Sequence, residues 1–188
     1  INELGGRIAF QYGNGKTITT DANGNRTVYE YDGAYRTTAI RYPDGTALKR
    51  EYQNGWMVKE TDRAGVEMTF TYDSRGNITK KEGAGIRTRY AYDKKNHLTA
   101  VTDACGSTTR AEYDSAGNLT KLTDGEGNVT AFSYDGRNRL IKQTDANGNV
   151  LTYSYSGSCL TETRINGRVT GRFSHDAMGR LTSRRDGA

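Results

Sequence analysis

The stretch Tyr113–Asn128, which reads YDSAGNLTKLTDGEGN, decides the fold of this 188-residue chain. The Tyr-Asp pair at its start is followed by Gly117, and the later Asp124 is followed by Gly127. An Asp side chain accepts a hydrogen bond from the backbone N–H two residues on, and glycine tolerates a positive φ, so each group favours a tight turn. The residues between the two turns are enough for one short strand. The stretch therefore predicts one strand bounded by two turns, which is half of a β-hairpin repeat.

The same pattern recurs along the whole chain at steps of 19 to 21 residues. An internal repeat of this length predicts an array of supersecondary units, each of which packs only on its neighbours. We expect residues 1–188 to form a single repeat array that is truncated at both ends, without a separate catalytic domain. The tyrosines that end the first strand of each unit (the repeat tyrosines) are Tyr31, Tyr52, Tyr72, Tyr92, Tyr113, Tyr134 and Tyr155; Tyr12 precedes them, and His175 takes this place in the last unit.

The residues before each repeat tyrosine alternate in character. Val66, Met68 and Phe70 share the parity of Tyr72, and polar residues occupy the other parity. A period of two with aromatic and β-branched residues predicts a strand with one buried face. The same alternation places Ile86, Thr88 and Tyr90 with Tyr92, and Thr130 and Phe132 with Tyr134.

The predicted fold class is all-β. Tandem β-hairpins of about 20–21 residues form a long twisted antiparallel sheet, and the twist of the strands coils it. Only 34% of the residues are hydrophobic and the mean hydropathy is −0.84, which argues against a thick core. The 13 tyrosines can instead cover one face of a sheet, because each ring buries a large area.

The second strand of each unit leaves one question open. Val101 and Leu122 lie three residues beyond the first apolar residue of their strands, which is the wrong parity for one face. Either a β-bulge intervenes or the second face is partly covered. The first apolar residues, six past the repeat tyrosine or His175, are Val58, Ile78, Leu98, Leu119, Leu140 and Leu181.

The turn residues complete the predicted structural site. A turn aspartate follows most repeat tyrosines, and a residue that tolerates positive φ stands four past the tyrosine. Where Gln53, Ser156 or Gly13 replaces the aspartate, we expect the hairpin to persist with a weaker turn. The aspartates are Asp32, Asp73, Asp93, Asp114, Asp135 and Asp176; the later residues are Gly76, Asn96, Gly117, Asn138 and Gly179. A second set of turns begins at Asp21, Asp62, Asp124 and Asp145, and Pro43-Asp44-Gly45 forms another.

The sequence offers no constellation for catalysis, a cofactor or a metal. His97 and His175 lie in distant repeats, so we interpret His97 as an ordinary strand residue and His175 as a tyrosine replacement. The segments from Asp21 and Asp145 lack the sixth-place glycine and twelfth-place glutamate of an EF-hand loop. We therefore predict that the chain is not an enzyme.

The distribution of charges, apolar residues and cysteines argues against a nucleic-acid site, a membrane span and a disulfide. The net charge of +5 is scattered, which favours a solvated face over a nucleic-acid site. No apolar run is long enough to span a membrane, and residues 1–6 do not resemble a secretion signal. Cys105 and Cys159 fall in turns on opposite edges, roughly 20 Å apart, so we predict that they form no disulfide.

These residues resemble the Rhs/YD-repeat family. The resemblance rests on seven or eight YD-type units in register, with TDxxGN-type turns between them, and covers nearly the whole chain. It implies a β-sheet strip that spirals into a hollow shell, as in bacterial polymorphic toxins, toxin-complex proteins and teneurins. In the toxins the shell encloses a C-terminal toxin domain. The family's terminal DPxGL-type motif is missing, so the chain resembles an internal stretch of shell.

The resemblance also implies partners and a location. These are flanking repeats, an enclosed toxin domain, and a secreted or cell-surface setting. Unpaired edge strands predict self-association of the isolated chain. The alternative function is a carbohydrate-binding or adhesion module, in which Tyr and Phe rings stack on sugars and basic residues hold acidic glycans. Packed rings at Tyr72, Tyr92, Tyr113 and Tyr134 favour the shell, whereas rings in open grooves favour carbohydrate binding.

Overall fold

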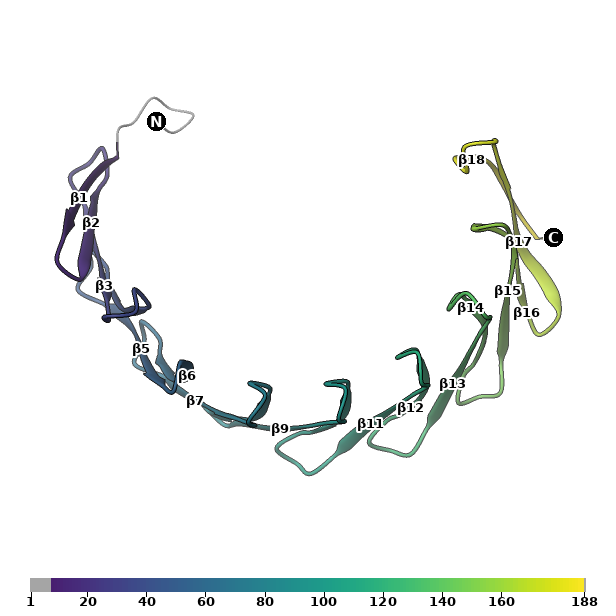
Figure 1. The fold of residues 1–188 in the computed structure, drawn as a ribbon, viewed down its shortest axis with the longest axis horizontal. Coiled ribbons are helices and arrows are strands. Elements are labelled where there is room, and N and C mark those ends of the chain that lie inside the picture. The colour runs from purple at the N-terminus through teal and green to yellow at the C-terminus, as the bar shows by residue number, and fades with distance from the viewer. Residues whose placement is uncertain (1–7, 188) are drawn as a thin grey trace. The chain divides into compact units, whose positions relative to one another are not determined.

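A computed structural model describes residues 8–187, which contain 18 β-strands and no helix (Figure 1). All the strands belong to one antiparallel sheet, which confirms the all-β repeat fold. Residues 1–6, where we predicted no secretion signal, lie outside the described residues. The described residues contain no helix, and therefore none that could span a membrane.

The chain divides into two compact units, Ile1–Tyr90 (unit 1) and Ala91–Ala188 (unit 2). Both units consist of the same hairpin repeat. The strands that begin in unit 1 are β1 (Ala9–Gly13), β2 (Lys16–Thr20), β3 (Arg26–Tyr31), β4 (Thr37–Arg41), β5 (Ala47–Gln53), β6 (Trp56–Thr61), β7 (Glu67–Tyr72), β8 (Ile78–Gly83) and β9 (Ile86–Tyr92). Those of unit 2 are β10 (Leu98–Thr102), β11 (Thr108–Tyr113), β12 (Leu119–Thr123), β13 (Val129–Tyr134), β14 (Leu140–Thr144), β15 (Val150–Ser156), β16 (Cys159–Ile165), β17 (Arg168–His175) and β18 (Leu181–Asp186).

One face of each strand that ends in a repeat tyrosine is covered, as the alternation predicted. In β7, Met68, Phe70 and Tyr72 are half-buried, whereas Glu67, Thr69 and Thr71, which alternate with them, are exposed. The prediction was wrong for the outermost apolar residues: Val66 and Ile86 are 41% and 46% exposed, because they lie at or just before the start of a strand. The described residues form a single-layer sheet without a thick core.

A β-bulge explains the unexpected parity of the second strands. Tyr113 pairs with Leu119, but Glu112 pairs with Lys121, so Thr120 is an extra residue in β12. Beyond it Leu122 pairs with Ala111, which has the parity of Tyr113. The extra residue brings Leu119 and Leu122 to the same face, which decides for the bulge and against a covered second face.

The turn that follows a repeat tyrosine (the first turn) exists in two forms. Most first turns contain the aspartate, but Asn54-Gly55 connects β5 to β6 and Gly157-Ser158 connects β15 to β16 directly. Asn54 and Gly55 have φ values of 50° and 88°, which a type I′ turn requires. The expected weaker aspartate-type turn was therefore wrong: these hairpins use a different, shorter turn.

The shorter turn shifts two residues from their predicted places. Tyr52 pairs with Met57, so Val58 is the bulge residue and not the partner of the tyrosine. Cys159 is the first residue of β16 and not a turn residue, whereas Cys105 lies in the turn begun by Asp103. Both thiols are free.

Turn form also explains the uneven repeat length. The step from Tyr52 to Tyr72 is 20 residues and not 21, because its first turn is one residue shorter. The step from Tyr12 is only 19, because that hairpin has a short turn and its strand pairing contains no bulge. The small variations in spacing therefore report local backbone geometry.

Candidate functional site: clamps between hairpins

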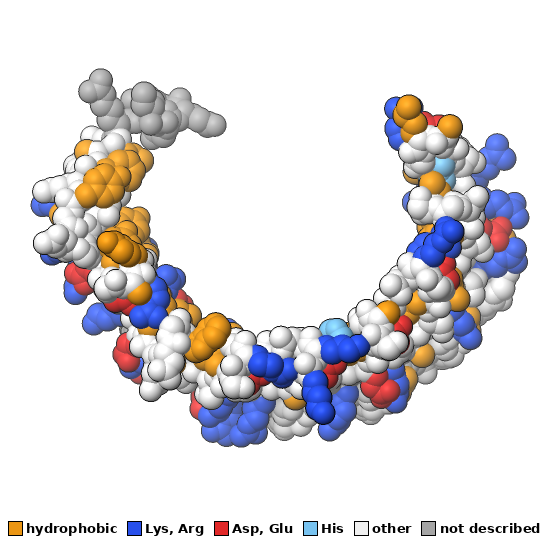
Figure 2. Space-filling model, viewed as in Figure 1, with side chains coloured by type: hydrophobic (Ala, Val, Ile, Leu, Met, Phe, Trp, Pro, Cys, Tyr) orange, Lys and Arg blue, Asp and Glu red, His pale blue; other side chains and the backbone are white. Residues whose placement is uncertain are grey.

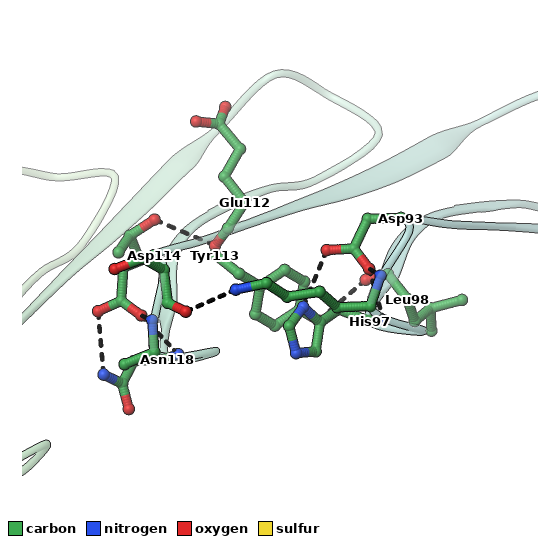
Figure 3. Close-up of polar contacts among 11 residues, drawn as sticks. Asp93, His97, Leu98, Glu112, Tyr113, Asp114 and Asn118 are labelled. Carbon is green, nitrogen blue, oxygen red and sulfur yellow. Dashed lines mark hydrogen bonds and ion pairs between the residues drawn. The ribbon is translucent and has the colours of Figure 1, made fainter.

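Most turn aspartates hold their turns through both carboxylate oxygens, whereas Asp62 uses Oδ1 alone. Asp114 Oδ1 accepts bonds from the backbone N–H of Ala116 and of Asn118, each at 2.9 Å (Figure 3). Asp114 Oδ2 accepts a third, from the Asn118 side-chain amide at 2.9 Å. The bond two residues on confirms the prediction, and the bonds four residues on were not foreseen. Asp32, Asp73, Asp93, Asp135 and Asp176 make the same backbone bonds, as do Asp21, Asp62, Asp124 and Asp145 in the second turns.

The residue four past the tyrosine has a positive φ, as predicted. The values are 87°, 89° and 78° at Gly76, Gly117 and Gly179, and 69° and 60° at Asn96 and Asn138. Sequence reasoning missed a further member of this set. Tyr35, with φ 60° and 88% of its surface exposed, holds the same position after Tyr31.

Four of the repeat tyrosines bind the preceding hairpin through their hydroxyl groups. The Tyr113 hydroxyl donates a 2.9 Å hydrogen bond to the carbonyl oxygen of Leu98, 15 residues earlier, at the start of β10 (Figure 3). Because Leu98 belongs to one hairpin and Tyr113 to the next, this bond joins consecutive repeats. Equivalent bonds run from Tyr52 to Thr37 (3.0 Å), from Tyr72 to Met57 (2.7 Å) and from Tyr155 to Leu140 (2.9 Å).

A side chain from the preceding first turn covers each of these four rings. His97 stacks on Tyr113 with the ring centres 4.8 Å apart, and Figure 3 shows the two rings face to face. Trp56 stacks on Tyr72 at 5.5 Å. The guanidinium groups of Arg36 and Arg139 lie 4.7 and 4.5 Å from the ring centres of Tyr52 and Tyr155. We call the hydroxyl bond and its covering residue a clamp.

The turn aspartate orients three of the covering residues. Asp93 Oδ2 lies 2.9 Å from His97 Nδ1, and the corresponding oxygens of Asp32 and Asp135 accept from the Nε groups of Arg36 and Arg139 at 2.7 Å. The predicted role of the aspartate was turn capping alone. The interpretation of His97 as an ordinary strand residue was wrong: it precedes β10 and forms part of a clamp.

The family model described as RHS Repeat matches residues 12–47, 72–108, 92–129, 113–150 and 134–158. These segments cover more than half of the chain. The chain belongs to the RHS repeat family. Every matched segment begins at a repeat tyrosine or at Tyr12, and residues 48–71, which contain the short Asn54-Gly55 turn, are not matched.

Solved structures share this RHS repeat fold. The crystal structure of TcdB2-TccC3 gives a TM-score of 0.75 and 17% identity over 87% of this chain and 10% of that chain. TcdB2-TccC3 without its hypervariable C-terminal region gives a TM-score of 0.73 and 15% identity, covering 94% of this chain and 12% of that chain. A Photorhabdus luminescens Tc holotoxin pore gives a TM-score of 0.61 and 14% identity, covering 85% of this chain and 12% of that chain. The chain therefore spans about a tenth of the length of these proteins. No curated protein matches it.

Hydrogen bonding lowers the pKa of several RHS turn aspartates and so favours their charged form. The side-chain amide and backbone N–H of Asn77 lower the pKa of Asp73 to about 2, and Arg139 does the same for Asp135. Burial alone would raise the pKa of Asp93, but the backbone and ring bonds from His97 outweigh it and lower the pKa. The charged carboxylates therefore support the turns at neutral pH.

The remaining predicted residues occupy their expected strand ends. Tyr92 and Tyr134 are half-buried at the ends of β9 and β13, and the backbone N–H of Tyr31 donates to Gly15 at 2.8 Å. His175 pairs with Leu181, in the register of a repeat tyrosine. Residues 8–187 contain no group of three or more side chains suited to a metal ion.

The two faces of the sheet differ in chemistry. Glu112 points away from the Tyr113 clamp in Figure 3 and pairs with Lys121 at 3.0 Å on the opposite face. On that face too, Glu30 pairs with Arg41 at 2.8 Å, and Glu162 with Arg164 and Arg172 at 2.7 and 3.1 Å. One face therefore carries the clamps and the other is mainly a solvated face of ion pairs.

Proposed function

We propose that this RHS repeat chain is a segment of the wall of a protein shell that encloses a toxin domain. The observation that carries the proposal is the chain of clamps. Because four of the repeat tyrosines bond the hairpin before them, the same connection recurs as successive repeats extend the sheet. The fold shared with the TcdB2-TccC3 structures supports this role.

The two-faced sheet suits a wall. A single layer needs one face that packs on itself through large rings and another that remains solvated by charge. Tyr92, Tyr113 and Tyr134 are half-buried, which supports a shell over open carbohydrate-binding grooves; Tyr72 is also half-buried but lines a groove. An enclosed domain and a secreted or cell-surface setting complete the proposal.

Limited proteolysis of the full-length protein tests enclosure. We expect the polypeptide outside the repeats to be cleaved slowly while the wall is intact. Double substitution of Tyr113 and Tyr155 to alanine removes two clamps and should speed that cleavage. A matched pair, Glu112→Ala and Lys121→Ala, removes an ion pair from the other face and should leave the rate unchanged. Equal cleavage in all three proteins would refute enclosure.

We further propose that the chain has a structural and not an enzymatic role. The aspartates are engaged in their turns, so they are poor candidates for general acids or bases. Turnover in an assay panel that disappears when one of Asp73, Asp114 or His97 is substituted, in a chain that still folds, would overturn this proposal.

A further inference from the structure

A groove in unit 1 adjoins the Trp56–Tyr72 clamp. It has a volume of about 490 Å³ and lies between the first turn of β5 and β6 and the next strand, β7. Its lining includes Gln53, Asn54, Trp56, Tyr72, Asp73 and Ser74. Ligand sites commonly have volumes of about 300–1,000 Å³, with an aromatic lining and a few polar groups. Hydrophobic side chains of unit 1 reach the surface in separate patches in Figure 2.

Trp56, the single tryptophan of the chain, forms a fixed platform in this groove. It stacks on Tyr72 with an interplanar angle of 24°, and a Cβ added at Gly76 would overlap the far edge of its ring. Trp56 as a whole residue nevertheless remains 45% exposed. The clamp therefore holds the indole in one orientation and leaves much of its surface open to a ligand.

Polar groups that can bond a ligand stand beside the platform. The exposed side chains of Gln53 and Asn54 make no hydrogen bond within the part of the chain that the structure describes. Each amide supplies two N–H donors and a carbonyl acceptor. The short turn places both amides here, where an aspartate-type turn would carry a carboxylate.

The charged residue of the lining is already engaged. Asp73 Oδ1 accepts from the backbone N–H of Arg75 and Asn77, and Oδ2 accepts from the Asn77 amide at 3.0 Å and lies 3.3 Å from the Arg75 guanidinium. Because this charge is compensated within its turn, the groove has no strong preference for an ionic ligand.

We propose that Trp56 with Gln53 and Asn54 forms a binding subsite for a neutral saccharide. A pyranose with equatorial hydroxyls has a flat C–H face that stacks on indole, and its rim hydroxyls match the two amides. This site differs from the binding surface considered from the sequence, which was an array of tyrosines with basic residues for acidic glycans. Here the platform is one tryptophan and the neighbouring groups are neutral.

Tryptophan fluorescence of the full chain tests the subsite directly, because Trp56 is the only indole present. We expect chitotetraose or cellotetraose to change the emission saturably. A tetrameric glucuronate should have at least a tenfold weaker effect. Emission that is unchanged by both neutral sugars, or that changes only with the acidic one, would overturn the proposal.

Trp56→Arg separates the platform from the clamp. An arginine covers Tyr52 and Tyr155, so this variant should keep Tyr72 covered and retain its melting temperature. Calorimetry should show saccharide binding at least tenfold weaker than in the parent chain. Binding of equal strength would refute the role of the indole.

Asn54→Gly tests the amide without straining the turn, because glycine accepts the φ of 50° found there. We expect binding several-fold weaker, with Trp56 emission retained. Unchanged affinity in this variant and in Gln53→Ala would remove the amides from the site and contradict the proposal.

A relocated indole provides the matched control. The double variant Trp56→Arg and His97→Trp keeps one tryptophan in a covering position, but its first turn lacks the two free amides. Its emission should not respond to either neutral saccharide; an equal response would show non-specific stacking. A polyproline peptide that quenches Trp56 in the parent chain, where saccharides do not, would show a peptide groove instead and overturn the proposal. The shell proposal is independent of all these outcomes.

Discussion

The hairpins formed by β5 with β6 and by β11 with β12 make the same clamp, through Tyr52 and Tyr113, with different turns. Both tyrosine hydroxyls donate to a carbonyl 15 residues earlier, and both strand pairings contain a bulge beside the tyrosine. Yet Tyr113 is followed by an aspartate turn with three bonds to one carboxylate, and Tyr52 by Asn54-Gly55. The comparison teaches that the same clamp forms with either turn, and that the turn can be exchanged if it returns the chain to the same register.

The largest expected effect breaks an aspartate turn and a clamp together. Gly76→Val forces a valine into φ 87° and into the Trp56 ring, so we expect a loss of about 4 kcal/mol in the free energy of unfolding. Gly117→Val meets only the edge of the His97 ring, with Nε2 3.0 Å and Cε1 3.4 Å from the added Cβ, and should cost about 2 kcal/mol. Chemical denaturation measures both. Melting curves unaltered by Gly117→Val would contradict the turn assignment.

A smaller effect tests whether the clamp is independent of turn type. Tyr113→Phe and Tyr52→Phe each remove one hydroxyl and leave a carbonyl without its donor, so each should cost about 1 kcal/mol. The two losses should agree, although the turns differ. Hydrogen exchange at the neighbouring strands localises the change. A loss confined to the aspartate-type hairpin would show that the clamp depends on its turn.

The smallest effect per turn should appear on acidification. The pKa of Asp73 and of Asp135 is about 2 in the fold, below the value near 4 of an unfolded aspartate. The unfolded chain therefore takes up protons first. The stability that these carboxylates contribute is complete above about pH 4 and is lost as the pH falls through about 2. The melting temperature should decline across this interval.

The matched control replaces both carboxylates with amides. Asp73→Asn with Asp135→Asn should flatten part of the decline, because those two groups no longer titrate. The hairpin with the Asn54-Gly55 turn has no turn carboxylate, so its amide exchange should be the least sensitive to acid. A decline of equal steepness in the double variant would exclude these aspartates as its source.

Much of the fold could be predicted because its determinants are local. Alternation before Tyr72 and Asp-to-Gly turn spacing act within a few residues. The clamp could not be predicted, since the partner of the Tyr113 hydroxyl lies 15 residues away and is set by strand register and twist. Its covering residues gave no signal either, because Arg36, Trp56 and His97 share no chemistry beyond a planar group.

The short turns did leave a trace in the sequence. The 20-residue step after Tyr52 and the 19-residue step after Tyr12 mark missing residues, but a fixed offset from each tyrosine hid them and misplaced Val58 and Cys159. Spacing between equivalent residues is therefore as informative as their identity.

The recurrence of the clamp in four hairpins bears on how such genes change. Because each joint requires only a tyrosine hydroxyl and a carbonyl in the hairpin before it, unequal recombination between two tyrosine codons would exchange whole hairpins without disturbing their neighbours. Arrays of different length, or with one exceptional hairpin such as that of Trp56, can then arise by duplication and loss. A lineage could acquire or discard a specialised hairpin in one genetic event.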